Sequence, residues 1–449
     1  MEYLSMHLPE LKFGRKDVNV QAYEQALTSW TDDVPTCRES GVGSAINELY
    51  RRDGSRIQIH SFQDRSFRFR VEDYDLCVYG VFDGFGGAQV ADFVTKRIPA
   101  ELLWGQLVPE KSDEAVKETL RQAFISVDKE YFESIGDRLA ARMVMQCDPQ
   151  YSSSSQLEEL EDRVRAGSAG VLAVVLGNRL FVASIGDCRA LLYRSGEILP
   201  LSIDHTIYNE DELLRLSHLG VDLKLGVSYP ELGERSYTRC LGNYPVKGGY
   251  KESTLLASCQ DEPVIPEPEV LGGIPIQDFS FLLLYTKSLW HAVAEATGCQ
   301  DPDSEIAELC RYYFREESSL SGVAQAVVDQ VVRLHHDRLE ASGGRADTRE
   351  DITLLIREFG GCREPRGNTP GRGLSRGLMD KKEEKTLTRS SARPSRPTRS
   401  STTTESSGVY LAGKEIPIDE HGRIQPYVDF APFYQLWNQR KFSQGSSDK

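Results

Sequence analysis

Two β-rich runs separated by a tight turn near the middle of the chain limit its fold more than any other sequence feature. Ser168–Leu176 and Leu180–Ile185 are joined by Gly177-Asn178, a two-residue connection typical of antiparallel hairpins. A third run, Ala190–Tyr193, follows through a second short turn at Gly186-Asp187. The spacing therefore predicts an antiparallel meander rather than a parallel sheet.

Further strand and helix patterns surround this meander. Short β-rich runs predict strands at Leu76–Phe82, Phe279–Tyr285 and Ile352–Ile356. Apolar residues at helical spacing predict helices at Val90–Leu103, Glu114–Ile135, Glu210–Leu219, Leu289–Ala296, Ser304–Phe314 and Ala324–Leu339. Because strands come mostly as hairpins and helices come in pairs between them, we expect an α+β fold in which helices cover antiparallel sheets.

The apolar runs and the cysteines indicate where such a chain resides. The strongest apolar runs, Gly170–Leu176 and Phe279–Tyr285, fall far short of the roughly 20 residues that a membrane span needs. The start of the chain lacks the basic and apolar regions of a secretory signal. Nine widely spaced cysteines without a C-x-x-C pair favour reduced thiols over a disulfide framework or a zinc site. We therefore expect a cytoplasmic protein without a membrane span.

The charge of the chain changes abruptly near residue 361. Residues 361–408 carry 11 Lys+Arg and 5 Asp+Glu, and residues 409–449 carry 5 of each, so the part before residue 361 holds −21 although the whole chain has −15. Nucleic-acid phosphates require a basic face. An acidic body of this kind is not expected to bind nucleic acid.

The same change suggests domain limits. Residues 361–409 are rich in Gly, Pro, Ser, Thr and Arg and poor in large apolar side chains, which predicts a disordered linker. We divide the chain into an N-terminal extension (1–28), a folded domain (29–360), this basic linker (361–409) and a C-terminal segment (410–449) in which aromatic residues return.

One short motif in the folded domain suits a metal ion. The predicted strand Leu76–Phe82 runs directly into Asp83-Gly84. A carboxylate at the end of a buried strand and a glycine carbonyl that a ligand can approach are both hard oxygen donors for a divalent cation. Alone the signal is weak, because Asp-Gly is also a common turn.

Further motifs follow in a fixed order along the chain. They are Ala166–Tyr193 with Gly186-Asp187-Cys188-Arg189, then Asp204-His205, Asn209–Gly220, Thr238–Tyr244 and Pro266–Val270. Together with Asp83-Gly84 they resemble the metal-dependent Ser/Thr phosphatases of type 2C over roughly residues 35 to 360. The resemblance implies a sandwich of two antiparallel sheets flanked by helices. It also implies two metal ions bridged by a carboxylate, which activate water for attack on a phosphoryl group.

The residues at several of the implied positions depart from that pattern. Asp83 and Gly84 match, but the acidic pair expected near Asn47–Asp53 is not found there. Lys287 stands where the resemblance implies a metal-binding Asp. At about 4 Å and an effective dielectric near 20, a divalent cation would meet roughly 8 kcal/mol of repulsion from an ammonium.

Other positions change the chemistry as well. Glu350 replaces the last metal-binding Asp, and Asp351 replaces the Asn that normally follows it. Phe85 occupies the position of the proposed general-acid His and cannot transfer a proton. No convincing phosphate-binding Arg precedes the expected acidic pair.

These departures lead to the expectation of a catalytically inactive phosphatase fold, a pseudophosphatase that is not an enzyme. We expect no catalytic residue, no metal and no cofactor. We further expect Lys287 to replace the lost cation by pairing with Asp83 or Glu350, or else to point to solvent. The degenerate active-site positions are Asp83, Gly84, Phe85, Lys287, Glu350 and Asp351.

Two other readings of the folded domain stay open. The main alternative is a divergent metal-dependent Ser/Thr protein phosphatase that uses a single metal held by Asp83, Gly84, Glu350 and Asp351. The other is a decoy that binds phosphorylated proteins without hydrolysing them. The missing phosphate-binding Arg and the charge of −21 before residue 361 speak against the decoy.

The C-terminal segment carries a separate signal. Asp429 is a plausible helix N-cap, Pro432 is tolerated in a first turn, and aromatic residues then recur at i, i+3, i+4 and i+7. A helix of about 12 residues is marginal alone in water, so it needs a partner groove or the chain's own body. The side chains expected to bind a partner are Tyr427, Phe430, Phe433, Tyr434, Leu436 and Trp437.

The segment Pro426–Trp437 resembles the tail of adaptors that have a type 2C-like body and bind the TGF-β-activated MAP kinase kinase kinase. The resemblance implies that the short C-terminal helix binds that kinase and promotes its autophosphorylation in stress, cytokine and TGF-β signalling. Other signalling proteins are expected to bind the folded domain. A stress-activated MAP kinase docking region cannot be traced in the linker.

Overall fold

The computed structural model describes most of the folded domain. The described residues are 35–47, 49–50, 56–58, 61–71, 74–103, 107–148, 154–221, 223–224, 229, 232, 236–317, 319–341, 349–360, 409–411 and 414–416. The chain divides into two compact units, Met1–Glu383 and Glu384–Lys449. In the second unit, β14 (Val409–Leu411) pairs with β15 (Lys414–Ile416), and the predicted kinase-binding side chains lie outside the described residues.

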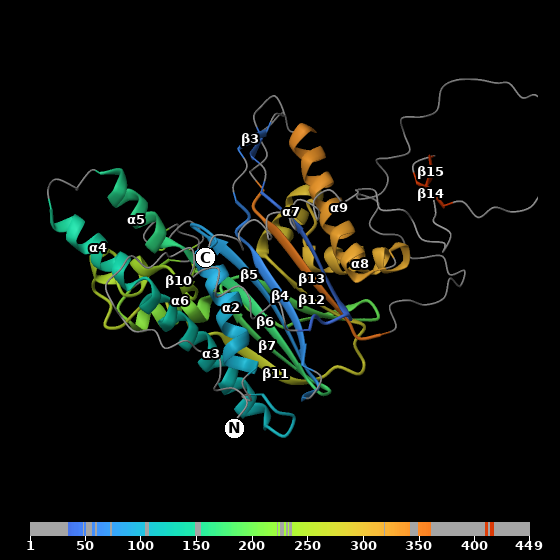
Figure 1. Ribbon diagram of the computed structural model, residues 1–449. Coiled ribbons are helices and arrows are strands. Elements are labelled where there is room, and N and C mark those ends of the chain that lie inside the picture. Colours follow the sequence, from blue (N-terminus) through green and yellow to red (C-terminus); the bar gives the residue numbers. More distant parts are fainter. Residues whose placement is uncertain are drawn as a thin grey trace, which may run out of the picture. The chain divides into compact units, whose positions relative to one another are not determined.

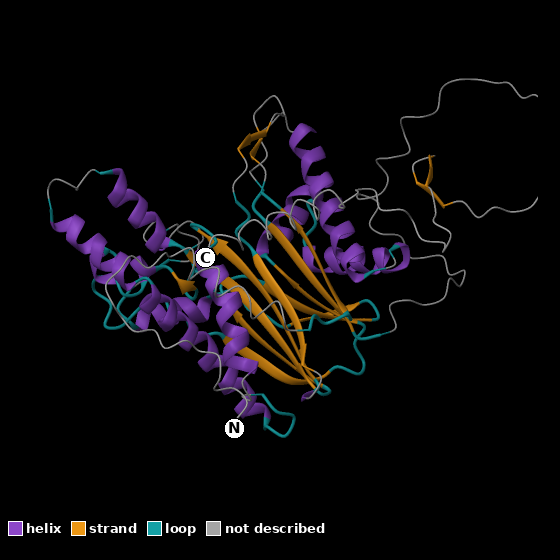
Figure 2. Cartoon of the chain, in the orientation of Figure 1, coloured by secondary structure: helices purple, strands orange, loops and turns teal. Residues whose placement is uncertain are grey.

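Two antiparallel sheets form the centre of the first unit (Figures 1 and 2). The first sheet has the order β11-β7-β6-β5-β4, and β10 also pairs with β6. Its strands are β4 (Arg65–Val71), β5 (Leu76–Phe85), β6 (Gly167–Leu176), β7 (Arg179–Ile185), β10 (Leu241–Gly242) and β11 (Glu269–Pro275).

The second sheet has the order β1-β13-β12-β8-β9. Its strands are β1 (Ser40–Ala45), β8 (Arg189–Arg194), β9 (Glu197–Pro200), β12 (Phe281–Tyr285) and β13 (Ile352–Glu358). A separate ribbon pairs β2 (Leu49–Tyr50) with β3 (Arg56–Gln58).

The predicted three-stranded meander is wrong in its last step. Strands β6 and β7 form the expected hairpin, but β8 pairs with β12 in the other sheet. The chain changes sheets at Gly186, whose φ is +76° and where an added Cβ would lie 2.5 Å from the Cβ of Ala169. A two-residue turn therefore serves here as a corner between layers, and its sequence resembles that of a hairpin turn.

Helices cover the outer face of each sheet (Figure 1). Helices α2 (Gln89–Leu103) and α3 (Asp113–Ser134) pack on the first sheet, and α7 (Lys287–Thr297), α8 (Pro302–Glu316) and α9 (Leu320–Ala341) pack on the second. The remaining elements are α4 (Gly136–Cys147), α5 (Ser155–Arg165), α6 (Glu210–His218) and the 3₁₀ turns η4 (Tyr244–Val246) and η5 (Tyr250–Glu252).

Local sequence signals explain several helix limits. Ser112 accepts a hydrogen bond from the Ala115 N–H at the start of α3, and Asp301 accepts one from Ser304 N–H at the start of α8, where Pro302 is the first residue. Gly298, with φ +69°, ends α7.

The hydrophobic core has three layers that follow this arrangement. One cluster fills the space between the two sheets, and the other two lie between each sheet and its helices. The glycines of β1 let α9 lie directly on that strand, because a Cβ on Gly41 would stand 2.1 Å from the backbone carbon of Leu320. The predicted fold class, two antiparallel sheets flanked by helices, is confirmed. No helix in the described part of the chain is long and apolar enough to cross a membrane.

Candidate active site

A cavity of about 1230 Å³ opens at the end of the sandwich where β5 finishes and β13 begins. Five of the positions singled out in the sequence line it: Asp83, Gly84, Phe85, Glu350 and Asp351. The structure therefore brings together residues that are more than 260 positions apart in the chain. The sixth position, Lys287, lines a neighbouring cavity of about 830 Å³, and Glu350 lines both.

Asp83 and Gly84 lie near the C-terminal end of β5. The Asp83 side chain is 2% exposed and lies on the face of the strand that is turned toward the second sheet. A Cβ on Gly84 would stand 2.6 Å from the backbone oxygen of Gln63. Only glycine therefore fits beside the Gln63 backbone at this point.

Asp64 is a buried carboxylate that the sequence reasoning missed. Arg65 pairs with Phe82 at the start of β4, and Asp64 and Asp83 directly adjoin that last pair. Asp64 is fully buried and accepts a hydrogen bond from the Thr353 hydroxyl at 2.8 Å. The acidic pair was expected near Asn47–Asp53, and this position is wrong. The buried carboxylate near Asp83 is that of Asp64.

Asp351 holds the loop that leads to this carboxylate. Its two oxygens accept the backbone N–H groups of Asn47 and Gln63, each at 2.6 Å. Charge-assisted hydrogen bonds of this length are among the stronger ones in proteins. Asp351 thus fixes Gln63, and with it the start of β4.

The buried Cys188 thiol lies close to several carboxylates at this end of the sandwich. Burial, and then the charges of three carboxylates, raise the pKa of the Cys188 thiol well above its ordinary value. The three carboxylates are those of Asp83, Asp187 and Asp64. Asp187, at the corner between the sheets, is a second residue whose part in the site the sequence did not reveal.

Phe85 closes one side of the cavity. Its ring lies 5.3 Å from that of Tyr237, measured between centroids, and the Tyr237 hydroxyl donates to Asp187 at 2.8 Å. Phe85 therefore contributes an apolar wall. It cannot supply a proton, as the sequence indicated.

Lys287 neither pairs with Asp83 or Glu350 nor points to solvent. Its ammonium lies 2.7 Å from Oδ2 of Asp204 and 4.4 Å from the centroid of the Trp290 ring. Its side chain is only 10% exposed. Both expectations for Lys287 are wrong because the sequence did not show that the turn at Asp204 reaches the start of α7.

The same Asp204 also binds a second cation. Arg189 donates to Asp204 at 3.1 Å and to Asp303 at 2.8 Å. Two cationic side chains, Lys287 and Arg189, therefore line the neighbouring cavity, and each is paired with a carboxylate.

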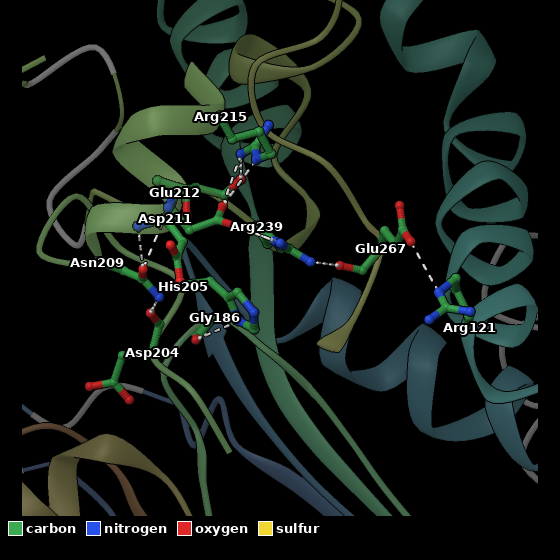
Figure 3. Close-up of polar contacts among 11 residues, drawn as sticks. Arg121, Gly186, Asp204, His205, Asn209, Asp211, Glu212, Arg215, Arg239 and Glu267 are labelled. Carbon is green, nitrogen blue, oxygen red and sulfur yellow. Dashed lines mark hydrogen bonds and ion pairs between the residues drawn. The ribbon is translucent and has the colours of Figure 1, made fainter. Parts of the chain in front are cut away.

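A hydrogen-bonded turn holds Asp204 in place (Figure 3). Asn209 caps α6 and donates to the Asp204 carbonyl at 3.1 Å, while the Asp204 carboxylate points away from the Glu212 cluster. The adjacent His205 ring donates from Nδ1 to the Gly186 carbonyl at 3.2 Å. Burial, and then the charge of Arg239, lower the pKa of His205 to about 4, so the ring is neutral at neutral pH.

Glu212 anchors this turn from α6 (Figure 3). The carboxylate is 3% exposed and accepts from Arg239 at 2.6 Å and from Arg215 at 3.0 Å. Burial alone would raise the pKa of Glu212, but the hydrogen bonds and charges of the two arginines outweigh it and lower that pKa to about 2. Glu212 is therefore a structural anion that ties α6 to the loop around Arg239.

The larger cavity offers oxygen donors that fit one divalent cation. Asp83, Gly84 and Glu350 line it, and the buried Asp64 directly precedes the residue that pairs with Phe82. Among the described residues, no three Asp, Glu, His or Cys side chains form a group that could hold a metal ion, so a cation here would have at most two carboxylate ligands. Mg²⁺ usually binds through one or two carboxylates and keeps several waters. The neighbouring cavity is lined by Lys287 and Arg189 but also by carboxylates, those of Asp187, Asp204, Glu295 and Glu350.

Comparisons of the sequence with a family model and with individual proteins point to the same family. The sequence matches the family "Protein phosphatase 2C" over residues 72–334. It is 25% identical over 287 residues to "Probable protein phosphatase 2C 22" of Arabidopsis thaliana, which covers 64% of this chain and 64% of that relative. It is 26% identical to "Probable protein phosphatase 2C 45" of Oryza sativa subsp. japonica, covering 59% and 81%. The matched part thus spans slightly less than two thirds of the Arabidopsis relative.

The chain was also compared with solved structures. The chain resembles serine-threonine phosphatase 2C from Toxoplasma gondii with a TM-score of 0.46 and 17% identity, covering 72% of this chain and 96% of that one. It resembles Stp1 from Staphylococcus aureus with a TM-score of 0.42 and 17% identity, covering 73% and 97%.

The expectation that the chain is not an enzyme is contradicted by these comparisons, because the relatives are named as protein phosphatases. Its physical basis is weakened at two points as well. The acidic group thought to be missing before Asp53 has a counterpart in Asp64, and the charge of Lys287 is neutralised by Asp204 in the neighbouring cavity. The match over residues 72–334 covers more than half of the chain, and the chain belongs to the protein phosphatase 2C family.

Proposed function

We propose that the chain is a divergent metal-dependent phosphatase that hydrolyses phosphoserine and phosphothreonine in proteins with a single divalent cation. The observation that carries this proposal is that two buried carboxylates, Asp64 and Asp83, adjoin the last pair of β4 and β5 at a cavity lined by Asp83, Gly84 and Glu350. The family of the chain, whose relatives are named as phosphatases, supports it.

The residues of the cavity have separate roles in this proposal. Asp83, the Gly84 carbonyl and Glu350 would hold the cation, with Asp64 adding negative charge beside Asp83. When bound, such a cation polarises a phosphoryl oxygen and lowers the pKa of its water. Asp351 accepts a hydrogen bond from the Gln63 N–H at 2.6 Å, and so would hold in place the residue that precedes Asp64.

The apolar wall determines which substrates should react most readily. Phe85 and Tyr237 exclude water from one side of the cavity, but Phe85 gives no proton to a leaving alkoxide. An aryl phosphate, whose leaving group needs little protonation, should therefore be hydrolysed more readily than an alkyl phosphate. p-Nitrophenyl phosphate is accordingly a suitable first substrate.

The proposal is tested by metal-dependent turnover of the full chain. Purified protein should hydrolyse p-nitrophenyl phosphate in Mn²⁺ or Mg²⁺, because the carboxylate end of the cavity needs a cation to accept a phosphate dianion. EDTA should reduce the rate to the level of the buffer blank, and excess Mn²⁺ should restore it. A rate in Mn²⁺ no higher than the blank would refute the proposed activity.

We also propose, from the resemblance of Pro426–Trp437 to the tail of kinase-binding adaptors and from its aromatic spacing, that the C-terminal segment 410–449 binds a MAP kinase kinase kinase of the TGF-β-activated class and promotes its autophosphorylation. Phe430, Phe433, Tyr434 and Trp437 follow helical spacing, the pattern by which an amphipathic helix occupies a groove. This binding does not compete with a phosphatase role for the folded domain, since the two use different parts of the chain.

Binding of the tail to the kinase domain is checked by calorimetry with full-length variants. Trp437→Ala should weaken binding about thirtyfold, as expected for loss of roughly 2 kcal/mol from a buried aromatic anchor. Phe442→Ala, outside the aromatic face, is the control and should bind like the wild type. Equal affinity of the Trp437 variant and the wild type would contradict the assignment of this face.

A further inference from the structure

A chain of buried hydroxyl groups connects α7 and β13 to the Asp64 carboxylate. The Thr353 hydroxyl donates to Asp64 at 2.8 Å, and the Thr353 N–H donates to the Thr286 hydroxyl oxygen at 3.0 Å. The Thr286 and Ser288 hydroxyls lie 3.0 Å apart, and the Ser288 hydroxyl donates to the Asp351 carbonyl. All of these side chains are buried.

The directions of these hydrogen bonds follow from the acceptors. A carbonyl can only accept, so the Ser288 proton lies on its bond to Asp351, and Thr286 must then donate to Ser288. The Thr353 proton lies on the bond to Asp64, because an ionised carboxylate has no proton to give. Backbone pairing between Thr286 and Thr353 fixes the position of the Thr353 side chain, since Thr286 N–H also donates to the Thr353 carbonyl at 3.1 Å.

We propose that Thr353 is a positioning residue that holds the Asp64 carboxylate near Asp83 and so sets the affinity of the cavity for a divalent cation. The inference rests on the proposed function. Partners that orient the groups around a metal typically change its affinity by about 10- to 100-fold when they are lost. Thr353 lies in β13 of the second sheet and Asp64 directly precedes β4 of the first, so this hydrogen bond connects the two sheets at the cavity end.

The test is Mn²⁺ affinity, measured by isothermal titration calorimetry on the full chain with the metal alone. Thr353→Val removes the hydroxyl but keeps nearly the same volume, and should raise the Kd for Mn²⁺ about tenfold. Thr353→Ser restores the donor and should recover most of the affinity. Thr95→Val removes a hydroxyl that bonds only within α2 and should leave the Kd unchanged.

A second pair of variants covers the case in which Thr353→Val does not fold. Thr353→Cys and Thr353→Ser differ little in volume, but a thiol is a weak donor. The Cys variant should bind Mn²⁺ several-fold more weakly than the Ser variant. In an Asp64→Asn background the Val substitution should have no further effect on the Kd, because the carboxylate it positions is gone.

The outcomes separate this inference from the proposed function. No measurable Mn²⁺ binding by the wild-type chain would overturn both. Binding and turnover by the wild type, with the same Kd for the folded Val or Cys variant as for Thr353→Ser, would overturn the role of Thr353 alone. A Kd raised equally in the presence and absence of the Asp64 carboxylate would show a general structural effect and would also overturn that role.

Discussion

Asp83→Asn is expected to lower kcat/KM for p-nitrophenyl phosphate in saturating Mn²⁺ by about 10³-fold, which corresponds to about 4 kcal/mol of transition-state stabilisation. Asp83 is 2% exposed and stands near the end of β5, where it lines the cavity together with Gly84. The amide has the same shape but no charge, so it can neither neutralise a cation nor bind it tightly. The measurement is initial rate against substrate concentration.

A matched control distinguishes the site from general effects on the fold. Asp113→Asn changes a half-exposed carboxylate that pairs with Arg179 at the start of α3 and does not line the cavity. It should keep activity within a factor of two or three of the wild type. If Asp83→Asn retains more than a tenth of the wild-type kcat/KM while folded, Asp83 does not bind the catalytic cation.

Glu212→Gln should destabilise the folded domain by about 3 kcal/mol at pH 7. A shift of the Glu212 pKa from 4.5 to about 2 corresponds to about 3 kcal/mol in favour of the ionised form. The substitution also leaves Arg239 and Arg215 without their shared anion, and loss of one partner from a buried ion pair is costly. Urea unfolding followed by circular dichroism measures the effect.

The pH dependence of unfolding gives a second readout. The folded-state pKa of Glu212 is lowered, so its contribution is complete above pH 4.5 and is lost as the pH falls toward 2. The pKa of His205 is also lowered, from 6.5 to about 4, and this group destabilises the folded state as the pH falls from 6.5 to 4. The Gln variant should therefore approach the wild type in stability only below pH 4.5.

The control for Glu212 is the preceding residue on the same helix, Asp211. Asp211 lies in the first turn of α6 and is exposed. Asp211→Asn should change the unfolding free energy by less than about 0.5 kcal/mol. A Glu212→Gln variant as stable as the Asp211 variant would mean that the arginine cluster does not stabilise the fold.

Much of the fold follows from local patterns in the sequence. The apolar runs that predict strands at Leu76–Phe82 and Ile352–Ile356 lie within β5 and β13, and the helical spacing finds α2, α3 and α9. The sheet to which β8 belongs could not be predicted, because the turn at Gly186-Asp187 is compatible with a hairpin and with a corner. Only packing against the other sheet decides between them.

The candidate site could be predicted only in part. Asp83 and Gly84 are recognisable because they end a strongly apolar strand. Asp64 precedes a strand with charged residues on its exposed face, and its place near Asp83 depends on the register between two strands. Lys287 was found by its position, but its partner Asp204 is 83 residues away and no periodic pattern connects them. The predicted kinase-binding side chains stay a prediction, since they lie outside the described residues.

The order of the second sheet has a consequence for synthesis of the protein on the ribosome. Strand β13 lies between β1 and β12, so β1 has no neighbour in its sheet until residues 352–358 have emerged. At about 5–20 residues per second, that delay lasts roughly 15–60 seconds. During this time β1 has no hydrogen-bonded neighbour in its sheet. Newly made protein should therefore depend on chaperones until translation has passed Glu358.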